Sequence, residues 1–179
     1  DGTAKPVVLT FRHALSLLKI GFRCKYEGSK MSVSSISLRR GDGSSAPLWT
    51  SAYFNAVNGT VVEGSSSEVL SYDYSGESYD FGSGEYEYVP MLICPYDYQA
   101  DGDYVLEFRF NSVDPDEEIP TLSYPIQTED IQGGFEAGKV YHFKFTLDNY
   151  IQFDGVNVSD TWEGGEDNNE ENPQTATEV

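Results

Sequence analysis

Three aspartates lie close together in one segment of the sequence, and carboxylates at such spacing are potential ligands of a calcium ion. They are Asp97, Asp101 and Asp103, in the segment DYQADGD. Calcium takes six to eight oxygen ligands, and the EF-hand spacing is absent, so this segment alone offers too few. A second acidic group has the same shortage and consists of Asp114, Asp116, Glu117 and Glu118. We interpret both segments as solvated loops and predict no metal and no cofactor.

The two histidines and two cysteines show no spacing that indicates a site. His13 stands beside apolar residues, which is typical of a partly buried structural side chain. His142 alternates with apolar neighbours, so its side chain should point away from them, at the surface of the sheet. Cys24 and Cys94 are compatible with one disulfide or with two buried thiols. A structural zinc site would need both histidines as well, and neither a CxxC nor an HxxxH spacing supports it.

Motifs of catalysis are missing from the sequence. It contains no nucleophile elbow, no glycine-rich phosphate loop and no metal-binding motif. A pair of carboxylates for glycoside hydrolysis cannot be recognised among 30 acidic residues, because any two of them can converge in a fold. We therefore predict that the protein is not an enzyme.

Tyrosine is the aromatic residue best suited to a binding surface here. Seven of the 13 tyrosines are Tyr72, Tyr74, Tyr79, Tyr86, Tyr88, Tyr96 and Tyr98. A tyrosine ring offers a flat apolar face and a hydroxyl group, which suits contact with a sugar or a protein. The alternative is that these rings pack on their neighbours in a sheet. Our predicted ligand-binding residues are Trp49, Tyr79, Tyr96 and Tyr98.

The elements that must position these residues are strands. Apolar side chains recur every second residue, the period of a half-buried strand, along much of the chain. The expected strands are residues 7–11, 18–26, 33–39, 68–74, 86–94, 104–110, 121–126, 141–147 and 150–158, with short strand-like pieces between Trp49 and Val62. Asn58-Gly59 predicts a hairpin, Pro90 an edge strand or bulge, and Asp154-Gly155 a bulge or tight turn. With no convincing helix, the pattern predicts an all-β protein, an antiparallel β-sandwich.

Charge and composition exclude several classes of partner. The net charge of −19 disfavours nucleic acid and anionic membrane surfaces. No apolar run reaches about 18 residues, so we predict no membrane-spanning segment. Residues 163–179 contain six acidic residues and no basic one, which predicts a disordered acidic tail after a sandwich domain at residues 1–162. The opening residues are not those of a signal peptide, and they fit either a cytosolic protein or a processed one.

Three segments, in order, carry a family resemblance. They are residues 9–15 (LTFRHAL), 91–95 (MLICP) and 135–147 (FEAGKVYHFKFTL), followed by a further strand and Trp162. This order resembles the fimbrillin families of Bacteroidales, with their F-x-H-x-L opening, apolar-Pro stretch, G-K-x-Y strand and terminal Trp. The resemblance covers residues 6–165.

The resemblance implies an exported protein of the cell surface and outer membrane. It implies a transthyretin-like sandwich with Greek-key connections, here the C-terminal domain of two. It also implies a major or minor subunit of a type V pilus (fimbrium). The family's lipoprotein signal is not among these residues, as expected for a trimmed form.

The predicted function is assembly or adhesion, with an extended segment of one subunit completing the sheet of another. The partners would be other fimbrial subunits. The predicted assembly residues are Tyr141, Phe143, Phe145, Ile151, Phe153, Val156, Val158 and Trp162. Residues 163–179 lack the alternating apolar side chains of a donor strand. A donor must therefore lie within residues 139–162, or the protein does not donate, which favours a terminal or tip role. The alternative function is a surface module that binds carbohydrate or a host protein through its tyrosine-rich loops.

Overall fold

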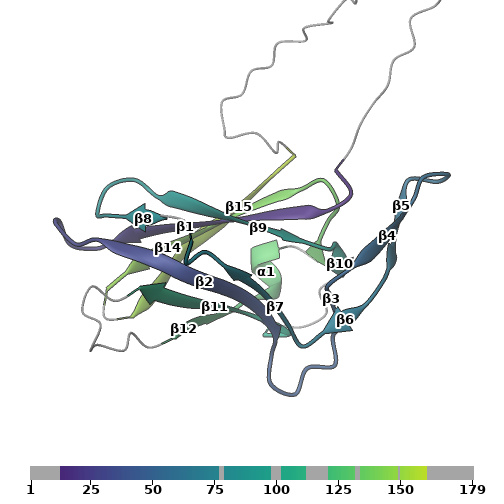
Figure 1. Ribbon diagram of the computed structural model, residues 1–179, viewed down its shortest axis with the longest axis horizontal. Coiled ribbons are helices and arrows are strands. Elements are labelled where there is room, and N and C mark those ends of the chain that lie inside the picture. Colours follow the sequence, from purple (N-terminus) through teal and green to yellow (C-terminus); the bar gives the residue numbers. More distant parts are fainter. Residues whose placement is uncertain are drawn as a thin grey trace, which may run out of the picture.

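The computed structural model describes residues 13–76, 79–97, 102–111, 121–131, 134–148 and 150–160. Two principal sheets form the protein and lie as two layers in Figure 1. The four-stranded sheet, in the order β15-β14-β1-β9, consists of β1 (Ser16–Cys24), β9 (Glu87–Ile93), β14 (Val140–Leu147) and β15 (Ile151–Ser159). The five-stranded sheet, in the order β12-β11-β2-β7 with β8 beside β2, consists of β2 (Met31–Arg40), β7 (Val69–Asp73), β8 (Asp80–Phe81), β11 (Tyr104–Asn111) and β12 (Leu122–Pro125). The predicted all-β sandwich is confirmed.

Smaller elements surround the two sheets. They are the pairs β3 (Leu48–Trp49) with β6 (Ser66–Ser67), β4 (Ala52–Asn55) with β5 (Thr60–Glu63), and β10 (Tyr96–Asp97) with β13 (Gly134–Phe135), and the helix α1 (Thr128–Ile131). The hairpin predicted from Asn58-Gly59 is β4–β5, and Gly59 has the positive φ of 71° that such a turn favours. This hairpin projects from the side of the sandwich (Figure 1).

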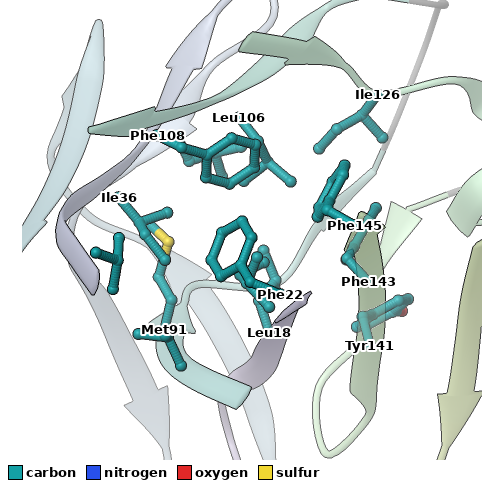
Figure 2. Close-up of a cluster of buried hydrophobic side chains, with 14 of the residues drawn as sticks. Leu18, Phe22, Ile36, Met91, Leu106, Phe108, Ile126, Tyr141, Phe143 and Phe145 are labelled. Atoms are coloured by element: carbon teal, nitrogen blue, oxygen red, sulfur yellow. The ribbon is translucent and has the colours of Figure 1, made fainter. Parts of the chain in front are cut away.

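The core lies between the two sheets and follows from the alternation of the sequence. On β1, every second residue from Leu18 to Cys24 is buried. In Figure 2 the side chain of Phe22 points toward Phe108, which comes from β11 of the facing sheet. The Phe22 ring lies 5.1 Å from that of Phe108 and 5.9 Å from that of Phe145, measured between ring centroids. Aromatic rings from both layers therefore form the centre of the sandwich.

Two details differ from the sequence analysis. β1 and β14 pair in parallel, from Leu17 opposite Val140 to Cys24 opposite Leu147, although the other strand pairs of the two principal sheets are antiparallel. The strands of the five-stranded sheet lie between them in the sequence, so no hairpin fixes their relative direction. Residues 75–85 are rich in Gly, Ser and acidic residues, which predicts an exposed loop, but they contain β8 and the buried Phe81. The strand predicted at residues 7–11 lies outside the described residues.

The two cysteines are free thiols and both are buried, which decides between the two alternatives that the sequence left open. Burial raises the pKa of Cys24 and of Cys94, so both thiols stay protonated near neutral pH. The Cys24 thiol donates a hydrogen bond to the Phe81 carbonyl, with 3.7 Å between sulfur and oxygen. Both residues behave as small core side chains.

Candidate assembly edge

One edge of the four-stranded sheet, β9, is closed to a further strand. Pro90 lies in the middle of β9 and has no N–H to donate, so the edge position predicted for it is confirmed. Two tyrosines of the facing sheet reach its carbonyl groups. The Tyr72 hydroxyl donates to the Leu92 carbonyl at 2.7 Å, and the Tyr74 hydroxyl donates to the Pro90 carbonyl. Burial raises the pKa of Tyr72, so its hydroxyl remains a donor over a wide pH range.

Replacing Tyr74 by phenylalanine should weaken this closure. Tyr74 is buried, so loss of its hydroxyl removes a hydrogen bond worth about 1 kcal/mol of unfolding free energy. Urea denaturation of the Y74F variant measures the loss. Tyr53 is exposed, and Y53F is the matched control, for which we expect no change. Equal unfolding free energies for the two variants would show that the Tyr74 hydroxyl does not hold β9.

The opposite edge of the same sheet is β15, and this strand contains no proline. β15 is nine residues long, and no strand in the described ranges pairs with its outer side. Its register with β14 places Phe153, Val156 and Val158 opposite core residues, so these side chains face the interior of the sandwich. Even so, Phe153 and Val156 are only half-buried and Val158 is 45% exposed. Apolar side chains that face inward yet reach solvent mark an edge at which the core is incomplete.

The edge strand of the other sheet, β12, lies on the same flank and contacts β15. The Tyr124 ring of β12 stacks on Phe153 with 4.4 Å between centroids. The buried Asp130 of α1 fixes this ring, because its carboxylate accepts hydrogen bonds from the Tyr124 hydroxyl and the Gln127 N–H, both at 2.8 Å. We call β15 and β12 together the open flank. Its partly buried apolar residues are Leu122, Tyr124, Ile151, Phe153 and Val156.

A bulge divides β15, as the sequence Asp154-Gly155 predicted. The register with β14 shifts at this point, and Asp154 is the extra residue. Its carboxylate accepts hydrogen bonds from the Tyr86 hydroxyl at 2.7 Å, from the Thr146 hydroxyl and from the Gln152 amide. Tyr86 precedes β9, so this contact connects the two edges of the sheet across its outer face. The Arg23 guanidinium lies 4.5 Å from the centre of the Tyr86 ring.

Asp154 should give the protein a component of stability that is lost in acid. Partial burial by itself raises the pKa of Asp154, but the hydrogen bonds from Thr146 and Tyr86 and the charge of Arg23 outweigh it and leave this pKa below its ordinary value. A carboxyl group with a lowered pKa stabilises the fold above its unfolded pKa of about 3.9, and this contribution disappears as the pH falls through the folded value.

The D154N variant, measured by urea denaturation against pH, tests this contribution. It should be less stable than the parent by about 1–2 kcal/mol above pH ~5, and the difference should shrink below pH ~4. A difference that does not depend on pH would mean that the charge of Asp154 adds nothing. Asp42, whose side chain is fully exposed, provides the control variant D42N.

The histidine on this face is a structural residue of the sheet surface. His142 lies on the outer side of β14, edge-to-face with Tyr88 at 5.6 Å between ring centroids. Burial and then the charges of Lys19 and Lys144 lower the pKa of His142, so it is neutral at pH 7. His13 is exposed.

The structure describes the side chains of two of the four predicted ligand-binding residues, Trp49 and Tyr79. Trp49 is half-buried against the core, and Tyr79 packs edge-to-face on Tyr74 at 5.4 Å between centroids. Tyr96 is described only by its backbone in β10, and Tyr98 lies outside the described residues. Tyr72, Tyr74 and Tyr79 pack together, whereas Tyr86 and Tyr88 lie on the outer face of the four-stranded sheet. Ligand binding by the predicted set, Trp49, Tyr79, Tyr96 and Tyr98, stays a prediction.

The predicted assembly residues fall into two groups. Tyr141, Phe143 and Phe145 of β14 are buried core residues, whereas Ile151, Phe153, Val156 and Val158 of β15 line the open flank. Trp162 lies outside the described residues. The sequence analysis missed Leu122 and Tyr124 of β12, which complete the flank, and the caps from Tyr72 and Tyr74 that close β9. The spacing of Tyr72 and Tyr74, two residues apart, places both side chains on one face of the sheet and was the available signal. This spacing does not predict that their hydroxyl groups bind the carbonyl groups of β9.

Of the acidic side chains in the two segments, the structure describes that of Asp103. No group of three or more His, Cys, Asp or Glu side chains in the described ranges is placed to hold a metal ion. Asp103 accepts a hydrogen bond from the Ser44 hydroxyl at 2.8 Å. Asp101 and residues 114–118 lie outside the described residues. No helix of the described residues is long and apolar enough to cross a bilayer.

The structure is a β-sandwich of two principal sheets, and tyrosine hydroxyl groups cap the carbonyl groups of one edge strand of its four-stranded sheet. The fimbrillin-like family model matches residues 1–162, and the chain belongs to this family. The resemblance on which the sequence analysis relied is thereby confirmed.

Solved structures show the same fold. One is the structure of a protein from Bacteroides uniformis assigned to cell adhesion, which matches this chain with a TM-score of 0.59 and 15% sequence identity. The match covers 83% of this chain and 51% of the Bacteroides uniformis chain. Another is the structure of a protein from Bacteroides ovatus, also assigned to cell adhesion, with a TM-score of 0.52 and 20% sequence identity. This match covers 87% of this chain and 47% of the Bacteroides ovatus chain. The chain therefore spans about half the length of these proteins. A search of curated proteins found no significant match.

Proposed function

We propose that this chain is a structural, non-enzymatic subunit of a fimbrium on the cell surface, and that it assembles by accepting a strand from another subunit at β15. Membership of the fimbrillin-like family supports the role in a fimbrium. The observation that carries the strand-addition step is the difference between the two edges of the four-stranded sheet. Pro90, Tyr72 and Tyr74 close β9, whereas β15 has no strand beside it in the described ranges.

The apolar side chains of the open flank explain why an added strand would be held. An incoming strand would form main-chain hydrogen bonds with the outer side of β15. Its alternate side chains would cover Val156 and Val158 and complete the core at this flank. Burial of apolar surface stabilises such a complex by roughly 25 cal/mol for each Å² removed from water. A terminal or tip position in the fimbrium remains part of this proposal, because the acidic residues 163–179 lack the pattern of a donor.

A charge on the edge strand tests this function. Val158 of β15 is 45% exposed and Val69 of β7, an edge strand of the other sheet, is 46% exposed, so V158K and V69K form a matched pair. Lysine at a sheet edge opposes pairing with a further strand. We expect V158K to lower the amount of this chain in sheared, purified fimbriae at least tenfold, and V69K to leave it unchanged. Thermal unfolding of both variants checks that they fold.

Equal incorporation of V158K and the parent chain would contradict strand addition at β15. Loss of incorporation by V69K alone would move the assembly edge to the five-stranded sheet.

A further inference from the structure

Basic side chains gather on the outer face of the four-stranded sheet, although the chain as a whole is acidic. It has 11 Lys and Arg residues against 30 Asp and Glu residues. On β1, Leu18, Ile20 and Phe22 are buried in the core, so the residues between them face outward. The register of β1 with its neighbours, together with the ring contacts of Tyr86, places on this outer face Lys19, Arg23, Tyr86, Tyr88, His142 and Lys144.

Two of these cations, Lys19 and Lys144, form no ion pair with another described residue. Arg23, by contrast, lies 4.0 Å from the Asp154 carboxylate. The other ion pairs of the described ranges use Lys25, Arg39, Arg40 and Lys139. Lys19 and Lys144 are both half-buried, so an anion bound beside them would interact with charges that water screens only in part.

The two lysines lie on either side of His142. Lys19 is directly opposite His142 in the pairing of β1 with β14, and Lys144 is two residues further along β14 on the same face. Burial and then the charges of Lys19 and Lys144 lower the pKa of His142, so both ammonium groups lie close to its ring. Two positive charges are therefore near one another on this face.

Tyr88 provides a flat apolar surface next to this pair of lysines. Gly21 has no side chain, and the Tyr88 ring leans over it from β9, with ring carbons 2.7, 3.0 and 3.1 Å from the position that a Cβ atom of Gly21 would take. Tyr88 is half-buried, so one side of its ring covers the Gly21 backbone and the other remains open to solvent. Pro90 and Leu92, both exposed, extend the apolar surface along β9.

A flat aromatic ring beside two unpaired cations matches the chemistry of an acidic sugar. The C–H groups on one side of a sugar ring can pack on the open side of Tyr88. A carboxylate or sulfate group on the same sugar can accept charge-assisted hydrogen bonds from Lys19 and Lys144. The net charge of −19 repels a long polyanion, so these features select a short or terminal acidic sugar.

We propose that the outer face of the four-stranded sheet binds an acidic sugar, with the sugar ring on Tyr88 and its acidic group at Lys19 and Lys144. This site does not use the β15 edge. A strand added at β15 would lie beside it in the plane of the sheet and leave the outer face open. The site and strand addition can therefore be tested separately.

NMR titration of the isotope-labelled chain tests the site. The probes are 3′-sialyllactose, which carries a carboxylate, and 3′-sulfolactose, which carries a sulfate; lactose is the uncharged control and tri-glutamate the acidic peptide control. We expect at least one acidic sugar to shift the backbone amide signals of Lys19, Tyr88 and Lys144 while those of β11 stay in place. Lactose and tri-glutamate should bind about tenfold more weakly or less, because each lacks one half of the interaction.

The remaining outcomes would overturn the proposal. Equal binding of lactose would mean that the lysines do not contribute. Equal binding of tri-glutamate would show a site for acidic peptides, in which Tyr88 does not stack on a sugar. An absence of shifts with both acidic sugars at millimolar concentration would mean that this face binds neither.

A matched pair of double variants tests the two lysines. K19Q/K144Q removes both charges from the site. K30Q/R109Q removes the same number of charges from Lys30 and Arg109, which are exposed and also form no ion pair with a described residue. We expect the first to weaken binding of the acidic sugar by about tenfold or more and the second to leave it unchanged. Equal affinities of the two variants would overturn the proposal.

The ring of Tyr88 is tested in the same titration. Y88L still covers Gly21 with an apolar side chain but has no flat ring, whereas Y88F keeps the ring. We expect Y88F to bind like the parent and Y88L to bind several-fold more weakly, with thermal unfolding as the check that both fold. If Y88L bound as tightly as Y88F, the sugar would not stack on this ring and the proposal would be wrong.

Discussion

Replacing Phe22 by alanine is expected to remove about 3–5 kcal/mol from the free energy of unfolding. Phe22 is fully buried on β1, and its ring contacts Phe81, Phe108, Phe110 and Phe145 from both sheets. The smaller side chain leaves a cavity that these rings, held by their own strands, can fill only in part. Because domains of this size are stable by only about 5–15 kcal/mol, the loss is a large share of the total.

Guanidinium denaturation measures this loss, and the chain supplies a matched control. Phe54 is also a strand phenylalanine, but it is exposed, so F54A should change the unfolding free energy by no more than about 0.5 kcal/mol. If F22A and F54A were equally stable, the core between the sheets would not be where the structure places it.

Replacing Gly41 by alanine is expected to destabilise the fold by about 3 kcal/mol or more, at the upper end of the range for overpacking. A Cβ atom at Gly41 would lie 1.8 Å from the backbone carbonyl oxygen of Gly102, and backbone cannot rotate away as a side chain can. The Gly41 N–H also donates to the Asp103 carbonyl at 2.7 Å, extending the pairing of β2 with β11. Relief of the clash would therefore separate the central strands of the five-stranded sheet at this end.

Gly84 is the control for this prediction. A Cβ atom there would have no heavy atom within 4 Å, and no positive φ restricts the position. G84A should therefore leave the thermal midpoint within a degree or two of the parent value, whereas G41A should lower it by more than about 6 °C. A small effect of G41A would mean that the backbones of Gly41 and Gly102 do not approach closely in solution.

The alternation of apolar residues was sufficient to predict most strands of the sandwich. β1, β11 and β14 follow the period-two pattern, because each buries one face against the other sheet, and β2 and β15 follow it on either side of a register shift. Pro90 correctly indicated an edge strand, since it cannot donate to a neighbour on its open side. The family resemblance was also correct, because it rested on the order of several segments and not on one motif.

The pairing of strands that lie far apart in the chain could not be predicted from the sequence. The parallel pair of β1 with β14 depends on the path through the other sheet, which no local pattern encodes. The same holds for the caps on β9, because Tyr72 and Tyr74 look like any other core-facing tyrosines until their hydroxyls are seen to reach the carbonyls of Leu92 and Pro90. The open flank likewise appears only when β12 and β15 are found side by side.

Hydrogen exchange of the backbone amides, compared between the free chain and the chain in purified fimbriae, tests the central claim most directly. If β15 accepts a strand, amides within Ile151–Ser159 should exchange more slowly in the fimbria, while those of β9, already closed by Pro90, Tyr72 and Tyr74, should not change. Unchanged exchange in β15, with new protection in β9 or β7, would contradict the account.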